Sequence, residues 1–439
     1  MNKFLQPIKN IFSIEELRNR IFYTIGFLLV FRLGSYVLLP GIDSEALKGG
    51  SGIFDFINLF AGGAFNRASI FALGIMPYIS ASIVIQLLTV ALPQFQKMQK
   101  EGESGRKKIT QITRFLTIAI TILQGGSYVA AYITPEAIIM EKAIFMPLSV
   151  IILTTGTMFC MWLGEKITDR GIGNGISMLI MIGIIAALPQ AIQQELSSSG
   201  VLLFVLEGIA LFFIVMAIIL LTQAVRRIPV QYAKQVVGAK TTAQVGSGQR
   251  SYLPLKVNAA NVMPIIFAQS LMFAPSLLAG LYAEESDFAL AVQKAYSDPT
   301  SWAYCITLAI LILVFTFFYT AITIDPNKMK DDLKRGGALI PGIKPGKPTA
   351  DYIATVLDRI TLPGAFYLAI VAILPAFAQM AGVQQSFAQF YGGTSLIIMV
   401  GVVLDTLQQI ESYLLMRQYD GLMKSGRLKG RSSQNTAVA

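Results

Sequence analysis

Ten long apolar runs constrain this sequence more than any other feature. They span 21–39, 69–92, 114–133, 144–163, 175–194, 201–223, 259–280, 302–324, 355–379 and 394–416. An α-helix needs about 20 apolar residues to cross the hydrocarbon core of a bilayer. Only 14% of the residues are charged, against about 25% in typical soluble chains. The sequence therefore predicts an all-α membrane protein with ten transmembrane helices.

Basic residues are distributed very unevenly among the segments that connect these runs. If the N-terminus is cytoplasmic, the cytoplasmic segments hold 30 of the 35 Lys and Arg residues. The outer segments hold four of them, Lys48, Arg67, Lys142 and Lys294. Cytoplasmic loops are normally the ones enriched in Lys and Arg. This distribution predicts that both termini are cytoplasmic, and it explains the net charge of +10 without nucleic acid.

The chain divides near "ELSSSG", residues 195–200, with five runs on each side. We predict an N-terminal half, 1–195, and a C-terminal half, 196–439. Because an odd number of spans separates their starts, halves that share a fold would form an inverted repeat. Two long cytoplasmic loops, 224–258 and 325–354, mix basic with apolar residues. Their composition suits the docking of a large partner, and a purely topological role for their charges stays open.

A shorter apolar stretch, "FDFINLFAGGAFNRA" at 54–68, follows the first run on the outer side. It is too short and too interrupted to cross a bilayer. It is also unusually apolar for a connecting loop, which favours a re-entrant segment.

Residue types that carry chemistry are scarce. The chain has no histidine, which excludes histidine acid–base catalysis and histidine metal sites. Neither an HExxH motif nor a P-loop is present, so we expect no enzymatic activity and no cofactor. Cys160 and Cys305 fall inside apolar runs and are expected to be core residues rather than a disulfide.

One alternative is an ion-coupled secondary transporter of a small solute. Such proteins place charged or coordinating groups at mid-membrane. Here Asp405, with Gln408, Gln409 and Glu411 nearby, would be the candidate group.

Five motifs carry a resemblance to a known family. They read "ASIFALGIMPYISASIVIQLL", "WLGEKITDRGIGNGISMLI", "LPLKVN", "IPGIKPG" and "YGGTSLII". Together they resemble the SecY family, the channel-forming subunits of the bacterial Sec protein translocase, from about Glu15 to Gly430. The resemblance implies a passive gated pore in the bacterial cytoplasmic membrane that passes unfolded secretory polypeptides and releases transmembrane segments laterally into lipid. It also implies the small subunits SecE and SecG, the SecA ATPase or a ribosome, and preproteins with signal sequences as partners.

The resemblance further implies a ring of apolar side chains that closes the pore. The matching residues are Ile75, Ile79, Ile176, Ile180, Ile266 and Ile398. Ile75 and Ile79, like Ile176 and Ile180, are spaced i, i+4 and so share one helix face. For all six to share a plane, the glycine-rich "RGIGNG" and "YGGT" must be irregular backbone inside the membrane thickness, bordering protein or a water-filled cavity.

By the same resemblance, 54–68 is a plug helix that blocks the outer cavity. Its matching residues are Phe54, Phe56, Leu59, Phe60, Gly62, Gly63, Asn66 and Arg67, with the paired glycines as a hinge. Gln86, Gln124 and Asn258 would lie along a lateral gate, and Asn174 and Arg170 would line the cytoplasmic funnel. Arg226, Arg227, Arg250 and Lys344 would dock cytoplasmic partners. Lys344 stands where the family usually has arginine, so the bidentate fork of a guanidinium is lost.

Overall fold

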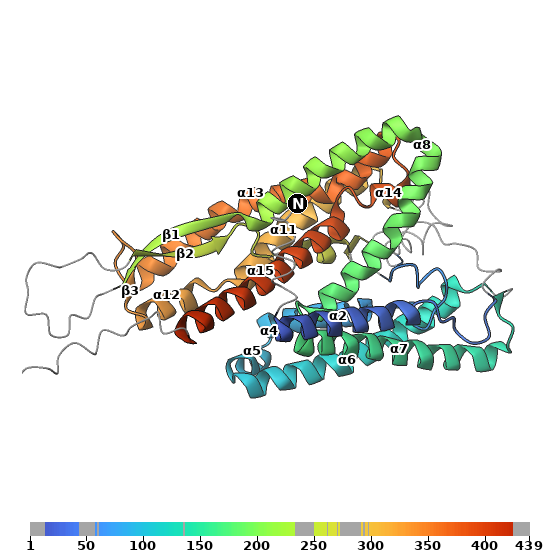
Figure 1. Ribbon diagram of the computed structural model, residues 1–439, viewed down its shortest axis with the longest axis horizontal. Helices are drawn as coiled ribbons and strands as arrows, with labels where there is room; N and C mark the ends of the chain where they lie inside the picture. The colour runs from blue at the N-terminus through green and yellow to red at the C-terminus, as the bar shows by residue number, and fades with distance from the viewer. Residues whose placement is uncertain are drawn as a thin grey trace, which may run out of the picture. The chain divides into compact units, whose positions relative to one another are not determined.

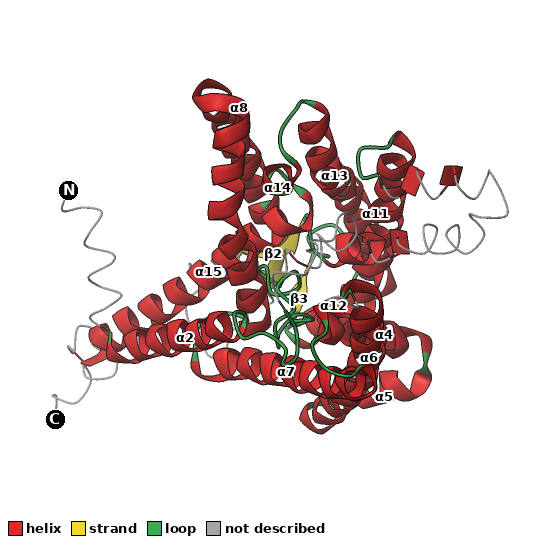
Figure 2. Cartoon of the chain, turned by 90° about the vertical axis from the view of Figure 1, so that its right-hand side faces the viewer, coloured by secondary structure: helices red, strands yellow, loops and turns green. Residues whose placement is uncertain are grey.

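The computed structural model is predominantly helical (Figure 1, Figure 2). It describes residues 14–43, 58, 61–134, 137–232, 250–260, 262–269, 271–272, 291–292, 295–296 and 298–424. Within this part of the chain, six helices are long and apolar enough to cross a membrane, and one bent helix pair would add a seventh. The predicted class, a helical membrane protein, is confirmed. The count of ten spans stays a prediction, since run 259–280, for example, is described only in part.

The chain forms two compact units. The first comprises 1–50, 54–186 and 402–439, and the second comprises 51–53 and 187–401. The inverted-repeat relation of two sequence halves stays a prediction.

In the described part of the first unit, five named helices are joined by the beginning of α8 and most of α15. The five are α2 (Glu15–Gly34), α4 (Met76–Ala91), α5 (Pro93–Lys100), α6 (Glu103–Tyr132) and α7 (Lys142–Arg170). Helix α6 packs against α4, α5 and α7, and α7 also packs against α2. Phe65, Phe145 and Leu153 are buried at the centre of one core cluster, together with Tyr128 and Tyr132.

Helix α4 begins later than the apolar run at 69–92 predicts. Residues 69–75 form turns, and the helix starts only at Met76 with a proline in its first turn. Proline suits that position because the first helical N–H groups have no intrahelical acceptor. Gly74 has a φ of 52°, a left-handed conformation that interrupts a right-handed helix. The apolar run therefore contains an irregular segment followed by a helix.

Helix α8 (Gly175–Gln223) contains two of the predicted spans in succession. They are separated at Gly200, whose φ of 75° and ψ of 162° are not helical. This glycine belongs to the "ELSSSG" junction from which the sequence predicts a break.

Among the described residues, the second unit contains the remainder of α8, the beginning of α15, a short helix at 263–269 and four further named helices. These are α11 (Trp302–Thr323), α12 (Pro326–Arg335), α13 (Lys347–Met380) and α14 (Gln385–Ala388), and α15 is Gly393–Lys424. Helix α13 packs against α11, α12 and α14.

A small antiparallel sheet in the second unit joins the two long loops predicted at 224–258 and 325–354. Its strands β1 (Val225–Tyr232), β2 (Arg250–Lys256) and β3 (Ala338–Leu339) have the order β2-β1-β3. Ile228 and Val230 are buried while their neighbours are exposed, the period of two that a half-buried strand requires. These side chains pack in one cluster with Ile353 and Leu357 of α13. The sequence predicts two loops here, and the structure makes them one folded element.

Candidate functional site

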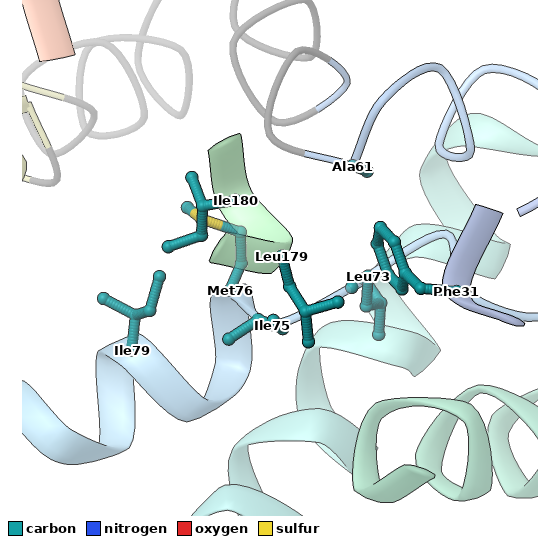
Figure 3. A pocket seen from close by; sticks show the side chains of 9 residues that line it. Phe31, Ala61, Leu73, Ile75, Met76, Ile79, Leu179 and Ile180 are labelled. Carbon is teal, nitrogen blue, oxygen red and sulfur yellow. The ribbon is translucent and has the colours of Figure 1, made fainter. Parts of the chain in front are cut away.

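A small apolar cavity in the first unit lies between the starts of α4 and α8 (Figure 3). Its volume is about 10 Å³, at the lower limit of the space that one water molecule needs. It is lined by Phe31, Ala61, Leu73, Gly74, Ile75, Met76, Ile79, Leu179 and Ile180. None of these side chains offers a hydrogen-bond donor or a strong acceptor, so water there would lack side-chain partners.

Four of the six predicted ring residues belong to this region. Ile75 and Ile180 are 6% and 8% exposed and line the cavity, and Ile79 lines it beside them (Figure 3). Ile176 packs against the same core cluster, which includes Phe31, Phe71 and Leu163. Ile75, Ile79 and Ile180 thus line one cavity, and Ile176, like Ile79, packs against the core cluster that contains Ile75.

The other two ring residues, Ile266 and Ile398, lie in the second unit. Ile266 is on a helix at 263–269, and Ile398 is buried on α15. The Thr394 hydroxyl, one turn before Ile398, lies 3.4 Å from Gln269 Oε1 and donates to it. A six-membered ring in one plane remains a prediction.

The backbone between α7 and α8, including the first residue of α8, is held by hydrogen bonds to side chains of other segments. Ile172 N–H donates to Thr24 Oγ1 at 3.0 Å, and Gly173 N–H donates to Gln409 Oε1 at 2.8 Å. Gly175 N–H donates to Thr168 Oγ1 at 2.9 Å. Irregular backbone at membrane depth needs such internal partners.

Asn174 caps the first turn of α8. Its Oδ1 accepts from the N–H groups of Ile176 at 3.1 Å and Ser177 at 3.4 Å, the usual role of an N-terminal cap. The predicted funnel-lining role of Asn174 stays a prediction, and the structure adds this capping role. Gln409, considered above as a coordinating group of a transporter, is engaged with the Gly173 backbone, while Asp405 is exposed.

A glycine on α7 permits α7 and α8 to approach closely beside the ring cluster. A Cβ at Gly164 would lie 2.9 Å from Cγ1 of Ile176, closer than carbon atoms pack. A larger residue at 164 would therefore displace a predicted ring side chain.

The described part of the plug stretch is packed into the first unit. Phe65 lies against the rings of Tyr128 and Tyr132, with centroids 4.6 and 4.8 Å away. The Tyr128 hydroxyl donates to the Phe65 carbonyl at 2.7 Å, and the Tyr132 hydroxyl donates to Asn66 Oδ1 at 3.0 Å. Phe54, Phe56, Leu59 and Phe60 lie outside the described residues.

The paired glycines of the stretch both have left-handed backbone. Gly62 has a φ of 63° and Gly63 a φ of 83°, which glycine adopts without the steric cost of a Cβ. The Gly62 carbonyl accepts a hydrogen bond from Arg67 and another from Arg32. Sequence reasoning gave Arg32 no role, although a lone charged residue inside an apolar span is itself a signal of function.

The predicted lateral-gate residues fall in both units. Gln86 lies on α4, partly buried, and Gln124 lies exposed on α6, the helix that packs against α4. Asn258 follows β2 in the second unit and is 5% exposed. Its Oδ1 has no hydrogen-bond partner among the described residues.

Three of the predicted docking residues lie on the small sheet. Arg226 and Arg227 are exposed on β1, and Arg250 begins β2, where it pairs with Gln231. Lys344 is exposed in the turn after β3, and its carbonyl accepts a hydrogen bond from Thr349 Oγ1 at 2.9 Å. The sheet brings segments that are 80 or more residues apart in sequence into one element, which no local pattern indicated.

Both cysteines are free and buried, as the sequence predicts. In the part of the chain that the structure describes, no group of three or more His, Cys, Asp or Glu side chains could hold a metal ion.

Comparisons with known proteins agree with one another. The model of the SecY family matches residues 69–407. The chain is 41% identical to a protein translocase subunit SecY of Streptomyces scabiei, over 94% of this chain and 98% of that protein. It is 42% identical to the subunit of the same name from Vibrio cholerae, over 95% and 96% of the two chains.

Solved structures share the fold at lower sequence identity. One, described as a protein-conducting channel, has a TM-score of 0.63 at 16% identity and covers 93% of this chain and 94% of its own. Another, Sec61 in a canine ribosome–channel complex from the endoplasmic reticulum, has a TM-score of 0.59 at 14% identity, with the same coverage.

Proposed function

This chain belongs to the SecY family of protein translocase subunits, and we propose that its resting pore is closed by the six isoleucines and by the plug stretch. It is the channel subunit of a translocon and not an enzyme. In the proposed closed state, Ile75, Ile79, Ile176 and Ile180 supply one side of the ring, and Ile266 and Ile398 supply the other.

One observation carries this proposal: the apolar cavity that Ala61 of the plug stretch shares with Ile75, Ile79 and Ile180. A narrow apolar constriction opposes ion flow because it does not hold a continuous chain of water. Isoleucine also lacks a polar atom, so a ring of isoleucines can close around many passing sequences without binding any of them.

Lateral release of transmembrane segments is the second part of the proposal. Gln86 and Gln124 would lie on one side of the gate and Asn258 on the other. A buried amide without a partner is costly, and the unpaired Asn258 Oδ1 would gain from a partner across the seam. These amide contacts would keep the lateral gate closed only weakly, so that an apolar signal sequence could open it.

Partners are proposed on the cytoplasmic and membrane sides. Arg226, Arg227 and Arg250 lie on the small sheet and Lys344 follows it in the chain. We propose that these residues dock the SecA ATPase or a ribosome. Two related channel structures were solved with ribosomes, the canine Sec61 complex and the yeast Ssh1 complex. We also propose SecE and SecG as membrane subunits, a bacterial inner-membrane location and cytoplasmic termini.

Crosslinking of a stalled secretory chain tests the pore. Single cysteines replace Ile79 and Ile266 in a background that carries Cys160→Ala and Cys305→Ala, and a photoreactive or thiol-reactive group is placed mid-chain. We expect both positions to crosslink. A cysteine at Leu202, which is 86% exposed on α8, is the matched control and should not. Absence of crosslinks at both isoleucine positions in a complex with a stalled chain would overturn the pore assignment.

A further inference from the structure

Two guanidinium groups converge on a single backbone carbonyl in the first unit. Arg32 Nη1, from α2, lies 3.1 Å from the Gly62 oxygen, and Arg67 Nη2 lies 3.1 Å from the same atom. Hydrogen bonds from charged donors are stronger than those from neutral ones. The Gly62 carbonyl is thus the most strongly held acceptor described in the plug stretch.

An aromatic side chain in the turn just after α2 completes the arrangement. The Arg67 guanidinium lies over the ring of Tyr36 at 4.3 Å, and the Arg32 guanidinium lies 5.5 Å from the same ring centroid. Arg32 Nη2 also donates to the Tyr36 hydroxyl at 3.4 Å. A ring face attracts cations, so Tyr36 offsets part of the repulsion between two like charges.

The surroundings of Gly62 leave no room for a side chain. A Cβ there would lie 2.7 Å from Arg32 Nη1 and 2.9 Å from the Cα of Gly183 on α8. Gly183 follows the ring residue Ile180 by three positions, about one helical turn. Arg32 therefore ties the plug stretch to α2 at the point where Gly62 lies against α8, within one turn of the predicted ring.

The charges of this cluster are incompletely compensated. Among the described residues, neither guanidinium is paired with a carboxylate, and Arg67 Nε is buried without a hydrogen-bond partner. An unpaired buried donor costs free energy. The two charged hydrogen bonds to the Gly62 carbonyl thus hold a short segment in place. The unpaired charge and the unpaired Nε lower the cost of breaking them.

We propose that Arg32, Arg67 and Tyr36 are positioning residues that latch the Gly62 carbonyl, and that breaking this latch frees the plug. The proposal rests on the proposed plug function of 54–68. The resting seal would then depend on the hydrogen bonds to the Gly62 carbonyl as well as on the isoleucines. Arg32 would help to keep the pore closed.

The test is the resting ion leak of the reconstituted full translocase in liposomes. Arg32→Gln and Arg67→Gln each remove one charged donor. We expect each to raise the resting leak roughly tenfold, the population change for the loss of a charged hydrogen bond. The double variant should leak more than either single variant but less than the product of the two increases, because both donors share one acceptor.

Variants of Tyr36 separate the latch from general packing. Tyr36→Phe keeps the ring and should leave the leak within about twofold of wild type, while Tyr36→Leu removes the cation–π contact and should raise it several-fold. Arg114→Gln is the matched control. It breaks an exposed ion pair with Glu165 elsewhere in the same unit and should leave the leak unchanged.

Translocation distinguishes the possible outcomes. A latch predicts that the arginine variants leak more and still translocate preproteins, with less dependence on an intact signal sequence. A merely structural role predicts loss of translocation for every substrate, which would overturn the latch. A wild-type leak in the actively translocating double variant would also overturn the latch while leaving the channel assignment intact. Failure of the wild-type complex to translocate would instead contradict the proposed function.

Discussion

Two irregular segments of the first unit precede the helices that carry the predicted ring residues, and they are held in different ways. The α4 lead-in (61–75) precedes Ile79, and the α8 lead-in (171–174) precedes Ile176 and Ile180. In the α8 lead-in, N–H groups find neutral acceptors, which are hydroxyl and amide oxygens of Thr24, Gln409 and Asn174. The Gly171 carbonyl also accepts from Arg20, a cation that is paired with Glu16. In the α4 lead-in, the Gly62 carbonyl is held by two cations, and no described carboxylate pairs with either of them.

This difference separates a fixed element from a releasable one. Breaking a neutral hydrogen bond in a buried site costs free energy, because it leaves a buried polar group without a partner. The charged contacts of the α4 lead-in bring positive charge with which no described carboxylate pairs. We therefore expect changes in the α8 lead-in to reduce stability and changes in the α4 lead-in to open the seal.

The largest effect is expected from Gly175→Ala at the first residue of α8, directly after the α8 lead-in. A Cβ at Gly175 would collide with the Gly164 carbonyl oxygen and lie 2.7 Å from the Ile167 Cβ. Overpacking of this kind costs about 3 kcal/mol or more, and we expect a large drop in the melting temperature of the purified complex. Gly208→Ala is the control, since no atom lies within 4 Å of the added Cβ; an equal drop in both would refute the steric explanation.

Thr24→Val tests the hydrogen bonds of the α8 lead-in. The substitution keeps the side-chain shape and leaves the buried Ile172 N–H without its acceptor, at a cost of about 1–3 kcal/mol. Denaturant or thermal unfolding in detergent measures the change. Thr110→Val, which removes an exposed hydroxyl from α6, should stay near wild type. If Thr24→Val increased the leak without loss of stability, the α8 lead-in would not be the fixed element.

Tyr128→Phe tests the α4 lead-in. It removes the 2.7 Å bond from the Tyr128 hydroxyl to the Phe65 carbonyl while keeping the stacked ring. We expect about 1 kcal/mol of destabilisation and a resting leak several-fold above wild type, measured on the same liposomes. If Tyr128→Phe lowered the free energy of unfolding and left the ion leak unchanged, this hydrogen bond would stabilise the fold without helping to seal the pore.

Arg114→Gln should have the smallest effect. Arg114 and Glu165 form a 2.7 Å ion pair that is partly exposed on both sides, and pairs of this kind contribute about 0.2–1 kcal/mol. The loss should shrink further in high salt because salt screens exposed charges. A decrease of more than about 2 kcal/mol in the free energy of unfolding, measured by chemical unfolding, would mean that this ion pair is stronger than exposed pairs usually are.

Much of the architecture was predictable because its signals are local. The "ELSSSG" junction predicts the break that the structure places at Gly200. The late start of α4 was not predicted, because 69–75 is as apolar as the helix that follows and hydropathy cannot distinguish a buried turn from a helix. The four first-unit isoleucines came from family resemblance, and the structure showed that Ile75 and Ile79 adjoin both Ile180, in one cavity, and Ile176, in one core cluster.

The sequence by itself determined that this chain is a helical membrane protein, and it predicts that the basic side is cytoplasmic. Span length and the sidedness of Lys and Arg follow from the thickness and charge preferences of the membrane, which act on each segment separately. Tertiary structure alone decided that Gln409 supports Gly173, 236 positions earlier, and that Arg32 reaches Gly62. Such contacts depend on which segments pack together, because a buried carbonyl or N–H takes whichever partner the fold brings within reach.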